Sequence, residues 1–160
     1  MKTKIQVIFG ATCAALLMGC ASAPVALAPV GPNPAAGPGA TANGQLEVFS
    51  ALVGRTEGEN PTWRQHTDYY VCDSRGRRLQ HVENTIGYYA QAPRLVTLPA
   101  GRYVVEAWAK YGQRMNVPVV IKPGKTTKVH LDDKWQPPAG TAKMELVRAP
   151  SGYDVGWRAE

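Results

Sequence analysis

Cysteine and histidine are scarce in this chain, with three of each among 160 residues. The histidines are 15 and 49 positions apart, without the close pairs that zinc sites use. We therefore expect no bound metal and no cofactor, and we interpret His66, His81 and His130 as scattered surface residues. A loose calcium site and a solvated turn explain the pair Asp132 and Asp133 equally well, because two acids alone do not make a site.

The chain also lacks a run of basic residues and any visible catalytic motif. Its net charge is +6, and loss of Lys2 and Lys4 with an export signal would leave 16 minus 12, or +4. This small positive net charge predicts no nucleic-acid binding and favours solubility or contact with anionic envelope polymers. Because no nucleophile–base pairing, metal spacing or phosphate-binding loop is visible, we do not expect an enzyme.

No apolar run near the start is long enough for a membrane-spanning helix. Residues 5–18 form an uncharged run of fourteen residues, whereas a spanning helix needs about 20. The run follows two lysines and no acid, which is typical of a secretory signal peptide. We therefore predict that residues 1–19 are a signal peptide.

The signal ends in Leu17-Met18-Gly19-Cys20, which resembles the lipobox of bacterial lipoproteins. The resemblance implies cleavage between Gly19 and Cys20, a diacylglyceryl group on the Cys20 thiol and, in many Gram-negative species, a further acyl chain such as palmitate. Two or three such chains hold a protein in a membrane essentially permanently. Ala21 is not the aspartate linked to inner-membrane retention, so the outer membrane is favoured, with its periplasmic or surface face left open. The alternative is an ordinary signal cut after residues 21–23.

A linker is predicted at residues 20–44. Residues 21–44 contain eight Ala, five Pro and four Gly, and no charged or aromatic residue. Such a stretch buries too little surface to offset its ordering entropy. Fully extended it would reach about 75 Å, and as a flexible coil about 25 to 30 Å. We therefore expect the folded domain, residues 45–160, to be held off the bilayer.

The domain is predicted to be a single small antiparallel β-sandwich, because short alternating strands and turn signals dominate it. Its prealbumin or immunoglobulin type is what a family resemblance of residues 98–131 implies. Turn residues at 73–76 indicate a hairpin, and Pro118 favours an edge or bulged strand. The predicted strands are residues 46–53, 67–72, 78–83, 102–110, 115–121, 126–131, 144–147 and 153–158.

A second resemblance concerns residues 98–131. The turn Leu98-Pro99-Ala100-Gly101, the strand led by Tyr103 and the later turn Gly124-Lys125-Thr126 are similar to the end of carboxypeptidase-regulatory-like, or transthyretin-like, sandwich domains. The resemblance covers roughly a third of the domain and implies a fold, not an activity. It also implies that Tyr103 buries its ring while its hydroxyl reaches a loop carbonyl.

Aromatic residues are the most suggestive candidates for ligand contact. Trp108 falls on the more polar face of its strand, and Trp63 and Trp135 are expected in Pro-containing loops, so their rings are available for stacking on sugars or for a protein contact. Most of the aromatic residues serve equally well as covers for the ends of the sandwich. The remaining aromatic candidates are Tyr88, Tyr89 and Trp157.

Two weaker candidates are the arginine cluster and Cys72. Arg75, Arg77 and Arg78 are suited to lipid phosphate or an acidic glycan, but we prefer a solvated turn. Cys13 would leave with the signal peptide and the thiol of Cys20 would be lipidated, so no second free thiol is available for an intramolecular disulfide with Cys72. We expect Cys72 to pack in a strand.

Two functions follow as hypotheses. The first is a membrane-anchored envelope lipoprotein whose non-enzymatic domain binds a protein partner or helps to assemble a surface structure. The alternative is a glycan- or peptidoglycan-binding module that uses exposed Trp and Tyr.

Overall fold

Short β-strands dominate the structure, as the alternating sequence pattern predicts. The structure, a computed structural model, describes residues 26–34, 42–55, 63–85 and 92–160, without the side chains of Arg55 and Trp63. Predicted residues that lie outside this description are Gly19, Cys20, Tyr88 and Tyr89. The strands are β1 (Val30–Gly31), β2 (Asn43–Phe49), β3 (Leu52–Arg55), β4 (Trp63–His66), β5 (Tyr69–Cys72), β6 (Arg78–Val82), β7 (Leu95–Pro99), β8 (Gly101–Ala109), β9 (Gln113–Ile121), β10 (Thr126–His130), β11 (Leu146–Arg148) and β12 (Asp154–Arg158).

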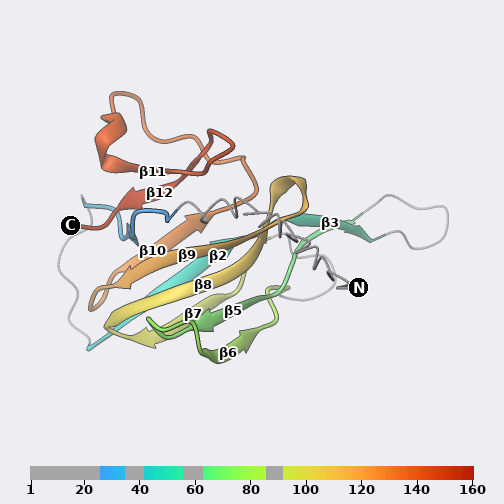
Figure 1. Cartoon of the computed structure of the whole chain (residues 1–160), viewed down its shortest axis with the longest axis horizontal. Coiled ribbons are helices and arrows are strands. Elements are labelled where there is room, and N and C mark those ends of the chain that lie inside the picture. The colour runs from blue at the N-terminus through green and yellow to red at the C-terminus, as the bar shows by residue number, and fades with distance from the viewer. Residues whose placement is uncertain (1–25, 35–41, 56–62, 86–91) are drawn as a thin grey trace, which may run out of the picture.

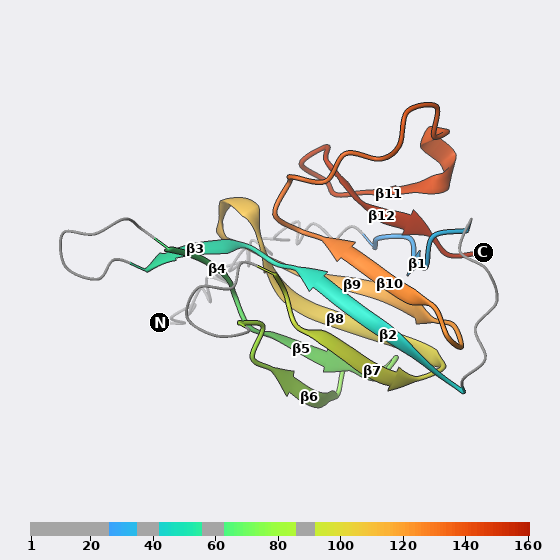
Figure 2. The same cartoon turned by 180° about the vertical axis from the view of Figure 1, so that it is seen from behind.

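Two sheets pack face to face around one core (Figures 1 and 2). The larger sheet has the order β11-β12-β1-β9-β8-β5-β6, and the smaller has the order β10-β2-β7. The hairpin of β3 and β4 projects from one end. The core joins Leu46, Val48 and Val129 of the smaller sheet to Val105 and Val117 of the larger one. The chain is therefore an all-β sandwich, and most strand pairs are antiparallel, as predicted; β2–β10 and β1–β9 run parallel.

The turn before β8 follows the prediction for Tyr103. Its ring packs partly buried against the core, and its hydroxyl donates a hydrogen bond to the carbonyl oxygen of Pro99 at 3.1 Å. The predicted hairpin of β5 and β6 is also confirmed. In its turn, Oδ1 of Asp73 accepts the backbone N–H groups of Arg75 and Arg77, each at 2.9 Å.

Two strand predictions need correction. The strand expected at residues 46–53 is broken at Ser50 and Ala51, so that β2 belongs to the smaller sheet and β3 to the projecting hairpin. Pro118 does not lie in an edge strand, because β9 has β8 on one side and β1 on the other. The missing N–H of Pro118 is tolerated there because β1 is only two residues long and pairs with β9 at Val119.

The expectation that residues 21–44 bury too little surface to become ordered is wrong for β1. Val30 pairs with Arg158 of β12 on one side and with Val119 of β9 on the other, and its side chain is fully buried. Leu27 and Ala28 also pack against the core. Strands β9 and β12 bury this segment, although its own residues cannot form a core. The free energy gained from that burial offsets the entropy lost when the segment becomes ordered.

Two glycines allow β1 to pack closely against β12 and the residue that follows it. A Cβ added to Gly156 would lie 2.7 Å from Cγ1 of Val30, and one added to Gly31 would lie 2.9 Å from Cα of Ala159. These separations are shorter than carbon atoms tolerate, so each glycine lets the neighbouring segment approach. The contact between β1 and β12 therefore depends on a small residue on each side.

Helix is limited, among the described residues, to the three-residue turns η1 (Lys110–Gly112) and η2 (Lys143–Glu145). Within this described part, no helix has the length and apolar character needed to cross a bilayer. The turn η2 occupies the start of the strand predicted at residues 144–147, so that β11 begins only at Leu146.

Substitution of Val30 tests whether this segment belongs to the fold. Val30→Ala should lower the free energy of unfolding by about 2 kcal/mol, because it leaves a cavity in the core. Pro34→Ala, at an exposed position of the same segment, should change it by less than about 0.5 kcal/mol. Urea unfolding measures both, and equal stabilities for the two variants would contradict the assignment of β1.

Candidate functional site

The outer face of the larger sheet gathers aromatic and charged side chains from several strands. Tyr70 of β5 lies opposite Glu106 of β8, and Trp108 of β8 lies opposite Arg114 of β9. These residues alternate with core residues along their strands, so the pleat turns them all to the same outer face. The ring of Trp108 remains 44% exposed.

Glu106 is the electrostatic centre of this face. Arg78 donates two hydrogen bonds to its carboxylate, each 2.9 Å long, and Nη2 of Arg114 lies 2.6 Å from Oε1. The hydrogen bonds from Arg78, together with the charges of both guanidinium groups, hold the pKa of Glu106 below its usual range. Glu106 is therefore ionised at neutral pH and serves as the acceptor for both arginines.

The two arginines also lie against aromatic rings. The guanidinium carbon of Arg78 is 4.0 Å from the ring centroid of Tyr70, and that of Arg114 is 5.6 Å from the centroid of Trp108. Cation–π attraction and the shared carboxylate of Glu106 restrict the rotamers of both arginines. The face is therefore largely arranged before any ligand arrives.

Two clefts flank Trp108. The first, of about 630 Å³, lies between the sheet face and the hairpin, and its lining includes Tyr70, His81, Glu106, Trp108 and Arg114. The second, of about 670 Å³, lies on the other side of the hairpin root, and its lining includes Arg64, Trp108, Lys110, Tyr111 and Lys134. Val53, Gly54, Thr67 and Trp108 line both clefts. The exposed indole is therefore placed to contact a molecule in either one.

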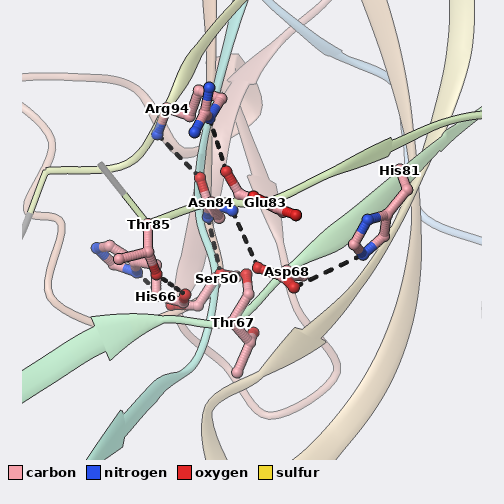
Figure 3. A network of polar contacts seen from close by, with 9 residues as sticks. All are labelled: Ser50, His66, Thr67, Asp68, His81, Glu83, Asn84, Thr85 and Arg94. Atoms are coloured by element: carbon pink, nitrogen blue, oxygen red, sulfur yellow. Dashed lines mark hydrogen bonds and ion pairs between the residues drawn. The ribbon is translucent and has the colours of Figure 1, made fainter. Parts of the chain in front are cut away.

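A buried polar network fixes the root of the hairpin (Figure 3). Asn84 is fully buried, and its Nδ2 donates to the carbonyl oxygen of Val48 at 2.8 Å and to Oγ of Ser50 at 3.0 Å. The hydroxyl of Ser50 in turn donates to the carbonyl oxygen of Thr67 at 2.6 Å. The network joins the end of β2, the entry to β5 and the segment after β6, so that the hairpin is held against the sheet.

The same network extends to the rim of the first cleft. Oδ1 of Asp68 accepts the backbone N–H of Asn84 at 3.0 Å, and Oδ2 lies 3.6 Å from Nε2 of His81 (Figure 3). The side-chain oxygen of Asn84 accepts the backbone N–H of Arg94 at 3.0 Å. Both Asp68 and His81 line the first cleft. Its rim is therefore tied to the buried core of the network.

Ser50 and His66 are neighbours without forming a nucleophile–base pair. Nδ1 of His66 lies 2.7 Å from the backbone oxygen of Ser50, not from its hydroxyl. Because a carbonyl oxygen only accepts, Nδ1 must carry the proton in this contact. The Ser50 hydroxyl is buried and already donates to Thr67. This pair contributes to the structure of the hairpin root.

His66 and His130 are not surface residues as predicted, since both are buried. The ring of His130 is stacked between Phe49, at a centroid distance of 4.5 Å, and Trp135, at 4.7 Å. Trp157 meets Trp135 edge to face at 6.0 Å. His81 remains exposed. The rings of Phe49 and Trp135 thus bury His130, a position that the alternation of its strand alone places outside the core.

The structure separates the predicted contact residues. Trp108 is exposed at the clefts, whereas Trp135 is half-buried in the aromatic stack. Trp63 begins strand β4 and does not lie in a loop; its side chain is outside the described part.

The arginine cluster is also divided. Arg77 pairs with Asp73 at 3.1 Å in the solvated turn that we preferred, and Arg75 is exposed in the same turn. Arg78, however, points to Glu106 on the sheet face. The three arginines therefore do not form one site.

Cys72 packs in β5 as expected. Its thiol is buried, and burial raises its pKa, so that it is protonated at neutral pH and is a weak nucleophile. In the described ranges, no three side chains of the metal-ligating types come together. Asp133 forms an ion pair with Lys110 at 2.6 Å, and Asp132 is buried, so this acidic pair is not simply a solvated turn.

Several residues of the clefts were not singled out from the sequence: Tyr70, His81, Glu106, Tyr111 and Arg114. The alternation of β8 places Glu106 beside Trp108 on one face, and that signal was available. The neighbours of Glu106 on β5, β6 and β9 depend on strand order and register, which alternation does not specify.

Comparison with known proteins returns no relative. No family model, no curated protein and no solved structure matches this chain.

Acid should weaken the sandwich through His130. Burial, with repulsion from Lys128 and His66, lowers the pKa of His130 from 6.5 to about 4. The unfolded chain therefore binds this proton more readily, and the free energy of unfolding should fall as pH drops from about 6.5 to about 4, by about 3 kcal/mol at most. Above this range the contribution is fully retained.

His130→Phe is the matched control, because it keeps an aromatic ring in the stack and removes the titration. Urea unfolding across that pH range should show a flatter dependence for the variant. Identical dependences for the two proteins would contradict the assignment to His130.

Proposed function

We propose that this chain is a lipid-anchored protein of the bacterial envelope, with the outer membrane favoured, and that its non-enzymatic β-sandwich binds a protein partner at the clefts around Trp108. The observation that carries the proposal is the exposed Trp108 between two clefts, on a sheet face already ordered by Arg78, Glu106 and Arg114. Tryptophan, tyrosine and arginine are the residue types that contribute most binding energy at protein interfaces.

Anchoring at Cys20 is supported by the lipobox and by the uncharged run that precedes it. The resemblance to carboxypeptidase-regulatory-like domains is part of the same proposal, and the hydrogen bond from Tyr103 to Pro99 supports it. A non-enzymatic role is supported by two observations: the carboxylate of Glu106 is occupied by Arg78 and Arg114, and the hydroxyl of Ser50 is engaged with the carbonyl oxygen of Thr67.

A glycan is the second candidate ligand, and the second cleft favours it. Trp108 and Tyr111 line that cleft together, and their exposed rings suit stacking on a sugar. Arg64 and Lys134 lie in the same lining as donors for hydroxyl or acidic groups.

Site-specific crosslinking in cells separates the two ligands. A photoreactive phenylalanine analogue in place of Trp108 should form an adduct with one reproducible protein, because the side chain at this position faces both clefts. Met144, 78% exposed and distant from both linings, is the control position.

An adduct at position 108 and none at position 144 would support a protein partner. Retention on purified peptidoglycan that is lost in Trp108→Ala, without a protein adduct, would favour the glycan. If no adduct formed at position 108 and no retention on peptidoglycan were seen, ligand binding at Trp108 would be contradicted.

The anchor has its own test. Cys20→Ala should abolish incorporation of radiolabelled fatty acid, because it removes the thiol that takes the diacylglyceryl group. Cys72→Ala should leave incorporation unchanged, since that thiol is buried. Equal labelling of Cys20→Ala and the unmodified chain would exclude the lipobox assignment.

A further inference from the structure

The position of β1 determines how closely the domain is tied to its anchor. Five residues lie between Cys20 and Ala26, where the described chain begins, and an extended chain of six residue-to-residue steps reaches only about 20 Å. This is far shorter than the reach of the whole segment 20–44. Because β1 is part of the sheet, the residues that follow it, 32–44, cannot act as a spacer between the anchor and the domain.

The pairing of β1 also orients the described residues that precede it, 26–29. β1 runs parallel to β9, with Val30 opposite Val119. β9 begins at Gln113, directly after the β8–β9 turn, so the residues that precede Val30 lie toward that turn. The residues that follow β1 lie toward the opposite end of β9, where Figure 1 shows the blue segment near the C-terminus. Ala26, which is at most about 20 Å of extended chain from Cys20, therefore lies toward the end of the sandwich that carries the β8–β9 turn.

That end exposes apolar and aromatic side chains. Val53, Trp108 and Tyr111 are 51%, 44% and 71% exposed, and all three line the second cleft. Arg64, Lys110 and Lys134 lie in the same lining. Two acids lie close by, Asp132 in that lining and Asp133, whose Oδ2 is 2.6 Å from Nζ of Lys110. Trp and Tyr rings next to Lys and Arg are the combination that proteins place at the headgroup level of membranes.

Tyr111 is held in a conformation that a tyrosine rarely adopts. Its φ is 69° and its ψ is 19°, and Gly112, which follows, has a φ of 70°. Asn or Gly fits such a turn with less strain. The turn thus presents a large ring to solvent at a cost in backbone energy, with Nζ of Lys110 5.0 Å from the ring centroid.

From these observations we infer that the end formed by the β8–β9 turn and the root of the β3–β4 hairpin rests on the phospholipid surface in which Cys20 is anchored, with Tyr111 at the headgroup level. The inference rests on the proposed lipid anchor. The first cleft then lies at the membrane surface, with its opening along the outer face of the larger sheet.

The test uses the lipidated full-length product, purified from membranes and reconstituted into vesicles of phosphatidylethanolamine and phosphatidylglycerol. A fluorophore is attached through an azide-bearing residue at position 111 in one sample and at position 144 in another. Both positions are highly exposed, and they lie on different parts of the fold. Vesicles that contain nitroxide headgroup lipid report contact by quenching.

Quenching several-fold stronger at position 111 than at position 144 is expected. Flotation with the vesicles but equal or weaker quenching at position 111 would overturn the orientation and leave the anchor intact. Absence of flotation would overturn the proposed anchor and this inference with it. A third label at position 34, at the exposed end of the β1 segment, should be quenched less than the label at position 111, and the reverse order would also overturn the inference.

Discussion

The insertion of β1 between β9 and β12 is the contact on which the larger sheet depends. In the strand order, β1 is the connection between the C-terminal hairpin of β11 and β12 and the other four strands. Val30 fills the space left by Gly156, and Gly31 admits Ala159. The two residues of β1 thus join two parts of one sheet, and the side chain of Val30 also packs in the core on the inner side of that sheet.

Local alternation predicted most of the sandwich. Along β8, the two-residue period puts Val105, Ala107 and Ala109 on one face, and all three are buried, while Trp108 was expected on the more polar face and is exposed. These outcomes depend on the two-residue period of a single strand, which is written in adjacent positions. The hydrogen bond of Tyr103 to Pro99 is local in the same way, because only four positions separate the two residues.

Non-local pairing accounts for what the sequence did not reveal. Composition alone made residues 21–44 a linker, because the surface that buries Val30 comes from β9 and β12, far along the chain. The histidine in the aromatic stack was placed outside for a similar reason, since its covers come from β2 and from the segment after β10. The grouping of Arg78, Glu106 and Arg114 likewise needs three strands in one register.

The pairing of β1 with β12 has a consequence for the order of folding. Val30 and Arg158 are partners across 158 minus 30, or 128, positions, and contacts at such separation form slowly because a long loop must close first. A chain that emerges with its amino end leading exposes β1 early, yet β12 follows only after every other strand. The sheet therefore stays open during synthesis and during any passage through an export channel, and it closes when the C-terminal hairpin arrives.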